Sequence, residues 1–266
     1  MQIVTFICLL VLLAFFYFAL RKKKPLPVTT TDDTIRKVLE EHVRFYQQLN
    51  EAEQSDFVER CIQFLEQVRI TAIKSELEDK DRIFVAAAAI IPVFAFKNWR
   101  YTNIREVLIY PGSFDHEFNQ AGSGRDILGM VGEGAMQNAM VLSQHELRNG
   151  FMNPADRSNT AIHEFVHLID KSDGSTDGIP EALLQHRYAI PWLREVHKEI
   201  KRIDDGKSDI NPYGATNEAE FFAVASEYFF ERPERMKEKH PVLFEMLEKA
   251  FHTNPHNEAE SSTLNA

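Results

Sequence analysis

The chain has 266 residues, of which 44% are hydrophobic and 26% charged, proportions typical of a globular protein with one sizeable domain or two small ones. Its formal net charge of −10 argues against direct binding of nucleic acid, because contact with the phosphate backbone needs clustered lysine and arginine. The only two cysteines are Cys8, in an apolar leader, and Cys61, so the body of the chain has no pair for a disulfide. This cysteine usage is typical of a reducing compartment.

The first predicted element is a membrane-spanning helix. Residues 3–20 (IVTFICLLVLLAFFYFAL) are 18 uncharged residues, which as a helix reach roughly 27 Å, close to the thickness of a bilayer's hydrocarbon core. A buried core helix is the alternative, but a helix without a polar face rarely packs in a soluble domain. The basic residues 21–24 follow the apolar run, whereas a cleavable signal peptide carries them before it. We therefore expect residues 1–24 to form a single-pass anchor in the cytoplasmic membrane, with the rest of the chain facing the cytoplasm.

Residues 25–31 (PLPVTTT) are predicted to be a short extended linker into the body of the chain. Apolar residues at helical spacing predict helices over 32–49 and 56–68, the first of them capped by Thr31 or Asp32. The apolar run 83–96 (IFVAAAAIIPVFAF) has 14 residues, which is short for a membrane crossing. It is predicted to be a buried helix with a kink at Pro92.

The second half of the body combines two short β-prone segments with several helices. Residues 106–110 (EVLIY) and 139–143 (AMVLS) are predicted strands, and the second is either an edge strand that could pair with an extended peptide or a covered core strand. Predicted helices cover 158–170, 190–203, 218–231 and 241–251, and residues 256–266 are expected to be a flexible polar tail. Helices, then strands, then helices predict an α+β domain over 32–255 with a small antiparallel sheet.

The segment AIHEFVHLID, residues 161–170, contains the candidate metal-binding and catalytic residues. His163 and His167 are four residues apart and share one face of the predicted helix, so both imidazoles can hold one zinc ion at about 2.0–2.1 Å. Glu164 lies about 100° around the helix, where its carboxylate can reach a water molecule bound to that ion. The alternative is a pair of core histidines beside a surface glutamate, but burying two imidazoles requires polar partners that the local sequence lacks. This H-E-x-x-H pattern on a helix is the metallopeptidase signature.

A catalytic zinc ion needs a third protein ligand, and Asp173 is the nearer candidate. Asp173 follows His167 by six residues, a spacing close to the extended metzincin pattern. That pattern turns the chain at a glycine, however, and this sequence has Asp170 there. The Asp170 carboxylate could instead hold a metal-bound histidine or a neighbouring loop, or be exposed to solvent at the end of the helix.

The other candidates for the third ligand are glutamates in NEAEFFAVASEYFFERP, residues 217–233. Glu220 and Glu227 lie two helical turns apart on one face. Glu220 also fits the third position of a capping box with Asn217 as the N-cap, which would be a purely structural role. The spacing leaves these alternatives open.

Several of these segments resemble a known family. HEFVHLID, DGSTDGIPEAL and NPYGATNEAEFFAVASEYFFERP are similar to the Mlc titration factor A family of zinc metallopeptidases, and YGATNEAEFFA is also similar to part of the catalytic domain of anthrax lethal factor. The resemblance to the first family covers 32–255 in layout and is specific over 129–233. It implies a mainly helical, zincin-like metallopeptidase domain that binds one Zn²⁺ per chain. The implied roles are metal ligands and catalytic groups: His163, His167 and Glu220 as ligands, Glu164 as general base and Tyr213 as a donor to the oxyanion.

The same resemblance disfavours Asp173 and implies a peptide or protein substrate. The namesake of the family binds a transcriptional repressor. An alternative function is therefore a binding protein that sequesters a transcriptional regulator and uses zinc only to hold its fold. A structural zinc site is usually closed by four protein ligands, whereas three ligands and Glu164 beside them favour an enzyme.

Overall fold

The computed structural model describes residues 30–114, 127–132, 137–153, 158–181, 183 and 188–252. The predicted anchor over 1–24, most of the predicted linker and the predicted tail over 256–266 lie outside the described residues. Within the part of the chain that is described, no helix is both long and apolar enough to cross a bilayer.

The N-terminal part consists of three helices, α2 (Asp32–His42), α3 (Arg44–Gln47) and α4 (Glu51–Gln67). The Thr31 side chain accepts a hydrogen bond from the backbone of the first turn of α2, which confirms the predicted N-cap. The predicted single helix over 32–49 is broken at Val43, whose φ of −107° and ψ of 95° are extended. Helix α4 begins five residues earlier than predicted, because Asn50 and Glu53 form a capping box at its start.

Helix α5 (Asp79–Ile90) and the 3-10 helix η1 (Ile91–Val93) form the apolar centre of this half. Every residue from 83 to 91 is buried, which confirms the predicted core helix. The α-helix ends next to Pro92, which has no N–H to continue its hydrogen bonding. At the other end of α5, the buried Asp81 carboxylate accepts from the Arg148 guanidinium at 2.6 Å, and this pair joins α5 to α6 (Gln144–Met152).

Within the described residues the sheet has four strands, in the order β1-β2-β4-β3. They are β1 (Arg69–Ala72), β2 (Glu106–Tyr110), β4 (Ala139–Ser143) and β3 (Gly129–Val131). The β1–β2 and β2–β4 pairs are parallel and only β3–β4 is antiparallel, so the predicted antiparallel sheet is wrong. Helix α5 lies between β1 and β2 in the chain and provides the crossover that parallel strands require.

The two predicted strands have the expected bounds, and of the two positions considered for Ala139–Ser143, an edge strand or a covered core strand, the structure shows the second. Strand β4 lies between β2 and β3, and four of its five residues are buried. The edge next to it is β3, which has three residues and begins at a glycine, too short and too irregular to give a sequence signal.

The remaining elements are mostly helical: α7 (Thr160–Asp170), η3 (Lys171–Asp173), α8 (Ala189–Asp204), η5 (Pro212–Ala215), α9 (Glu218–Glu231), α10 (Pro233–Lys239) and α11 (Pro241–His252). The predicted helices over 158–170, 190–203, 218–231 and 241–251 are confirmed to within two residues. The observed class is thus a mainly helical α+β fold with a small mixed sheet.

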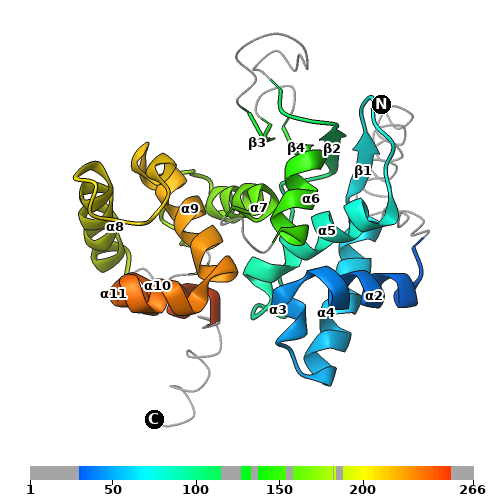
Figure 1. Ribbon diagram of the computed structural model, residues 1–266, viewed down its shortest axis with the longest axis horizontal. Helices are drawn as coiled ribbons and strands as arrows, with labels where there is room; N and C mark the ends of the chain where they lie inside the picture. Colours follow the sequence, from blue (N-terminus) through cyan, green and yellow to red (C-terminus); the bar gives the residue numbers. More distant parts are fainter. Residues whose placement is uncertain are drawn as a thin grey trace, which may run out of the picture.

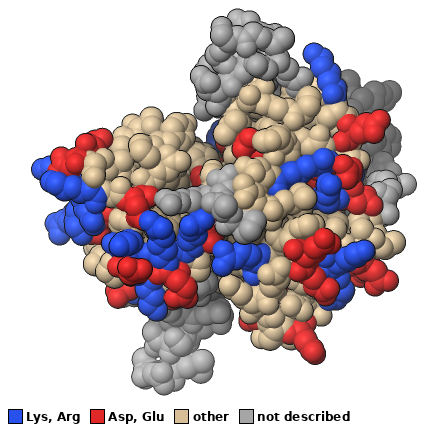
Figure 2. Space-filling view, viewed as in Figure 1, with Lys and Arg blue, Asp and Glu red and all other residues tan. Residues whose placement is uncertain are grey.

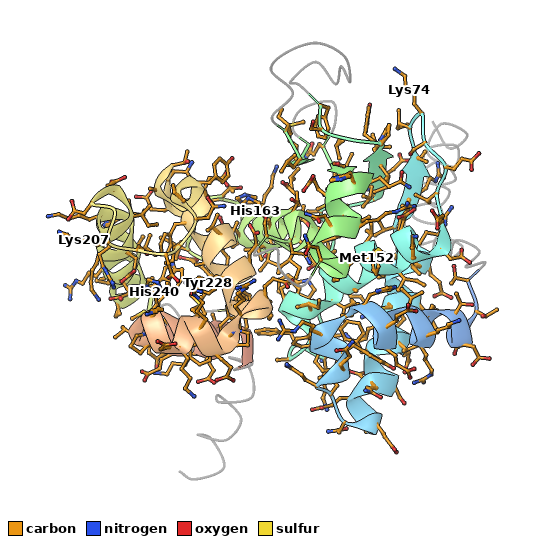
Figure 3. The ribbon with its side chains drawn as sticks, in the orientation of Figure 1. Lys74, Met152, His163, Lys207, Tyr228 and His240 are labelled. Carbon is orange, nitrogen blue, oxygen red and sulfur yellow. The ribbon has the colours of Figure 1, made fainter. Side chains whose placement is uncertain are left out.

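Helix α7 lies at the junction of the molecule. Figure 1 shows α8 to α11 on one side, and the sheet with α2 to α6 on the other. Helix α7 packs against α9 on the first side and against α5, α6 and β3 on the second. Figure 3 accordingly places His163 near the centre of the view, between the two groups. Acidic and basic side chains are interspersed across the face drawn in Figure 2, which shows no extended basic surface.

Candidate metal centre

The two histidines of the H-E-x-x-H pattern lie on α7, which is capped by Asn159. The Asn159 Oδ1 accepts a hydrogen bond from the backbone N–H of Ile162 at 3.2 Å, which satisfies one of the free donors at the start of the helix. Most residues of α7 are apolar and buried. The polar residues His163 and Glu164 are also largely buried, with exposed fractions of only 8% and 5%. The helix is therefore buried on several sides, and its polar residues are directed towards α9 and β3.

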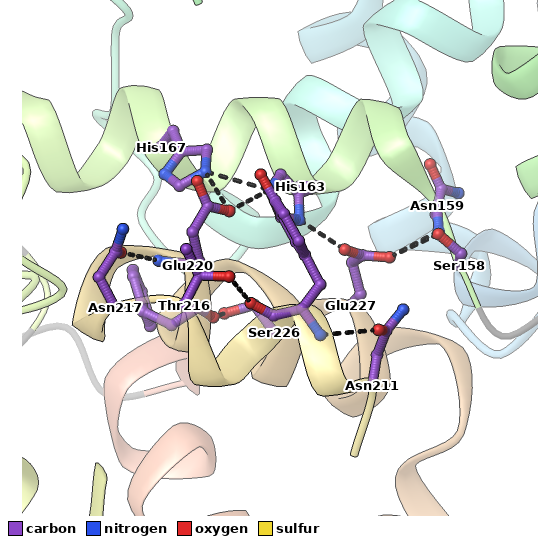
Figure 4. A network of polar contacts seen from close by, with 12 residues as sticks. Ser158, Asn159, His163, His167, Asn211, Thr216, Asn217, Glu220, Ser226 and Glu227 are labelled. Carbon is purple, nitrogen blue, oxygen red and sulfur yellow. Dashed lines mark hydrogen bonds and ion pairs between the residues drawn. The ribbon is translucent and has the colours of Figure 1, made fainter. Parts of the chain in front are cut away.

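Helix α9 brings Glu220 to these histidines. Its N-cap is Asn217, whose Oδ1 accepts from the Glu220 backbone N–H at 2.8 Å. The Glu220 Oε2 lies 3.0 Å from the Nε2 of His163 and 3.4 Å from the Nε2 of His167. Its carboxylate thus points at the two histidines, and the structural alternative of a capping box is not formed (Figure 4).

The three side chains fit a zinc ion. The Nε2 atoms of His163 and His167 are 3.1 Å apart, and one donor atom from each histidine and from Glu220 lies within 4.8 Å of the others. Four ligands at tetrahedral zinc distances are separated by about 3.3–3.4 Å, close to what is observed. The Nδ1 of His163 faces Glu227, so in the neutral imidazole the proton belongs on Nδ1 and the Nε2 lone pair faces the Glu220 carboxylate. A cation between these acceptors satisfies both.

The charges around the centre also favour a cation. Burial lowers the pKa of His163, but hydrogen bonds with the Glu220 and Glu227 carboxylates outweigh it and raise that pKa to about 10. Burial raises the pKa of Glu220, but the two histidines outweigh it and lower that pKa to about 2. The cluster therefore holds a positive charge strongly, and a metal ion and a proton compete for the same donors.

Glu227 is the functional residue whose role the sequence left open. It lies two turns after Glu220 on α9, and its Oε1 is 2.6 Å from the Nδ1 of His163. Its Oε2 accepts from the Ser158 hydroxyl and from the Asn159 backbone N–H, both at 3.0 Å. A carboxylate on the distal nitrogen of a metal-bound histidine fixes the tautomer and orientation of the ring. The signal in the sequence was the seven-residue spacing from Glu220, which placed both glutamates on one face.

Glu164 faces the same pocket from the other side of α7. Burial raises the pKa of its carboxyl group. A Cβ atom at Gly129 would lie 2.8 Å from the Glu164 side chain, so β3 can pass this close to Glu164 only with a glycine there. The pocket has a volume of about 290 Å³, and the described residues that line it are Ile127, Gly129, Met130, Val131, His163, Glu164, His167, Lys171, Thr176, Tyr213 and Glu220.

Tyr213 lies in η5, ahead of α9. Asn211 holds this segment by accepting a hydrogen bond from the Tyr213 backbone N–H at 3.0 Å. Tyr213 is 54% exposed, and the centroid of its ring lies 6.1 Å from that of the His163 ring. Partial burial and the nearby carboxylates of Glu220 and Glu164 raise the pKa of its hydroxyl, which stays protonated at neutral pH.

The structure does not bring Asp173 to the cluster. Asp173 is exposed, and its carboxylate accepts from the backbone N–H groups of Ser175 and Glu181, both at 3.2 Å. Asp170 is fully buried, and its Oδ2 accepts from the Gly178 N–H at 2.9 Å. Of the roles considered for Asp170, the structure shows the one that holds the neighbouring loop.

Comparison with known proteins agrees with this geometry. The chain is 31% identical over 226 residues to the Mlc titration factor A of Escherichia fergusonii, covering 78% of this chain and 82% of that protein. It is 29% identical over 224 residues to the protein of the same name from Pectobacterium atrosepticum, with the same coverage. A protein of Synechocystis sp. is 24% identical over 237 residues, covering 82% of this chain and 83% of that protein. The model of a peptidase family matches residues 17–252, and the chain therefore belongs to the glucose-regulated metallo-peptidase M90 family.

Proposed function

We propose that this chain is a zinc-dependent peptidase that hydrolyses peptide bonds in a peptide or protein substrate. The observation that carries the proposal is that one pocket is lined by three convergent metal-binding side chains and by the separate carboxylate of Glu164. Membership of a metallopeptidase family supports it. His163, His167 and Glu220 would hold the metal ion, and the carboxylate of Glu164 would remain free to act on a water molecule.

A zinc ion bound there supplies a Lewis acid and lowers the pKa of its water ligand to about 7. Glu164 acts as the general base that removes a proton from this water and delivers it to the leaving amine. Tyr213 donates a hydrogen bond from its hydroxyl to the oxygen of the scissile carbonyl as negative charge develops on it.

Strand β3 provides a place for an extended substrate. Among the described strands it is the edge of the sheet beside the pocket, and Gly129, Met130 and Val131 all line that pocket. The exposed backbone of an edge strand can pair with a peptide by strand addition. A peptide on this edge would lie beside Glu164, whose side chain is 2.8 Å from where a Cβ at Gly129 would be.

The test is the substitution Glu164→Gln, which keeps the size of the side chain and removes the base. The zinc-loaded variant is expected to retain its metal and to lose hydrolysis of a peptide library by about 100- to 10,000-fold. His163→Ala is expected to lose the metal and the activity together. Equal hydrolysis by Glu164→Gln and the unmodified protein would exclude the assigned mechanism.

A second candidate function follows from the names of the relatives. Two of them are called Mlc titration factor A, so this chain is also a candidate for binding and sequestering a transcriptional regulator, with a structural zinc ion. The two functions separate in the same experiment. A sequestering protein with a structural zinc site holds the regulator equally well with Glu164 or with glutamine at that position, and neither form cleaves peptides.

We also propose that residues 1–24 anchor the chain in the cytoplasmic membrane with the metal centre facing the cytoplasm. The uncharged run over 3–20 and the basic residues after it support this proposal. Deleting residues 1–24 is expected to release the protein from membranes without detergent. Retention of the shortened protein in the membrane fraction would contradict the anchor.

A further inference from the structure

One charged side chain in the wall of the pocket has no part in the proposed hydrolysis. The described residues that line the pocket include the acidic Glu164 and Glu220, and the basic side chain among them besides the two histidines is Lys171. Lys171 begins η3 directly after the last residue of α7, and its backbone N–H donates to the carbonyl of His167. It is partly buried, between the exposed loop that follows and the buried helix that precedes it.

The spacing of Lys171 places it on the metal-binding face. His163, His167 and Lys171 follow one another at intervals of four residues, which is the interval that keeps side chains on one side of a helix. Lys171 thus lies one turn, about 6 Å along the axis, beyond the second histidine. Its position is set by the same helix that sets the two ligands.

The ammonium group of Lys171 is available for a ligand. Among the described residues, the Lys171 side chain forms no hydrogen bond or ion pair. It has no such partner even though the chain has an excess of acidic residues and a net charge of −10. A lysine at the end of a helix also interacts favourably with the helix dipole, but that interaction does not require the side chain to line a pocket. The carboxylates of Glu164, Glu220 and Glu227, the last of which lies behind His163, together offset the charges of a zinc ion and of Lys171, and Lys171 supplies the ammonium group among the described residues that line the pocket.

We propose that Lys171 determines substrate specificity by binding a carboxylate of the peptide with its ammonium group. This inference rests on the proposed peptidase function. The carboxylate belongs either to an acidic side chain or to the C-terminus of the peptide. Residues of an extended peptide are about 3.3 Å apart, so a carboxylate within two or three residues of the scissile bond lies in reach of a lysine one turn away from the ligands. The pocket therefore favours acidic peptides or peptides cut near their C-terminus.

The experiment measures peptide binding to the zinc-loaded Glu164→Gln protein. This variant retains the side chains that line the pocket but is not expected to hydrolyse the bound peptide. The probes are fluorescent peptides of neutral residues in three forms: blocked at both ends, blocked with one glutamine changed to glutamate at each position in turn, and with a free C-terminal carboxylate. Their dissociation constants are compared in Glu164→Gln alone and with Lys171→Met, Lys171→Glu or Lys97→Met added. Lys97 is an exposed lysine beside a different cavity, so Lys97→Met removes the same charge outside the pocket.

We expect the protein with Lys171 to bind at least one carboxylate form about 3- to 30-fold more tightly than the neutral form. Lys171→Met is expected to bring that ratio close to one, Lys171→Glu to reverse it, and Lys97→Met to preserve it. A preference for glutamate identifies side-chain recognition, and a preference for the free end identifies C-terminal recognition. Equal binding of all forms, an unchanged preference in Lys171→Met or the absence of any peptide binding would overturn the inference. The binding assay does not require hydrolysis, so it tests the role of Lys171 independently of the peptidase proposal. That proposal fails in a separate assay, if the unmodified protein hydrolyses no peptide or if hydrolysis does not depend on Glu164.

Discussion

Replacing Glu227 by glutamine tests how the second carboxylate on α9 supports the metal centre. The change keeps the size of the side chain and removes its charge. In the native protein one oxygen faces the His163 Nδ1 at 2.6 Å, and the other accepts from Ser158 and Asn159 at 3.0 Å each. Glutamine has one carbonyl oxygen and one NH₂ group, so it can satisfy only one of these two sides.

The side with two donors, Ser158 and Asn159, attracts the carbonyl oxygen of the new amide. The NH₂ group then faces the Nδ1 of His163, which must become an acceptor. In the neutral imidazole that binds a metal ion, the single proton is then drawn to Nε2, the atom that faces Glu220 and His167. A protonated Nε2 cannot bind a metal ion, so binding requires His163 to return to the other tautomer against the new hydrogen bond.

Loss of such an outer partner typically costs about 10- to 100-fold in metal affinity, which corresponds to about 1.4–2.7 kcal/mol. We therefore expect Glu227→Gln to weaken zinc binding by this factor in a competition titration against a chromogenic chelator at neutral pH. Glu218→Gln is the control, because Glu218 lies on the same helix and pairs with the exposed His197 instead. If Glu227→Gln and Glu218→Gln bind zinc with equal affinity, the explanation of how His163 is held is wrong.

Two further predictions concern the pocket wall and the stability of the α8–α11 side. Gly129→Ala places a Cβ 2.8 Å from the Glu164 side chain, so we expect peptide hydrolysis to fall by about 10- to 100-fold while zinc content measured by metal analysis stays at one ion per chain. Normal activity would show that β3 can move away from Glu164. The buried His240 lies 2.9 Å from both Glu199 and Asp209; burial lowers its pKa, but these carboxylates outweigh burial and raise it. Its charge therefore stabilises the fold fully below about pH 6.5 and less as pH rises through the raised pKa, so His240→Gln should lower Tm by on the order of 10 °C in acid and by less in alkali. A difference in Tm that does not change with pH would contradict this assignment.

The local part of the centre could be predicted from the sequence because it depends on spacing along one helix. The interval between His163 and His167 fixes a common face, and the apolar residues around them fix which face is buried. The bounds of α9 followed from its own periodicity and from the N-cap at Asn217. Glu220 and His163 are 57 residues apart in the chain, and only the family resemblance predicted that they lie together. A local sequence pattern does not indicate how two helices pack against each other.

The sheet was harder to predict for a related reason. Two neighbouring strands are parallel when the connection between them crosses back over the sheet, and antiparallel when it is a short turn. The buried helix α5, which lies between β1 and β2 in the chain, is such a crossover connection. Strand β3, which forms the edge beside the pocket among the described strands, has only three residues and begins at Gly129, where a Cβ would lie 2.8 Å from the side chains of Glu164 and Thr160. Glycine has a low β propensity, so a sequence pattern does not indicate a three-residue strand that begins with Gly129.

Gly178 has a consequence for how the pocket can change. Its φ is +74°, and a Cβ there would lie 2.2 Å from the carbonyl oxygen of Glu218, so only a glycine lets the chain rest on the first turn of α9. Its N–H donates to Asp170 and its carbonyl accepts from Trp192, which fixes the same point to the end of α7 and to α8. The end of the histidine helix and the start of the glutamate helix are thus held together at one point, where the main chain of Gly178 meets the Asp170 carboxylate and the first turn of α9. The residues 172–177 before it are exposed and include Thr176 in the pocket wall, so we expect substitutions there to change that wall and to leave the metal-binding geometry unchanged.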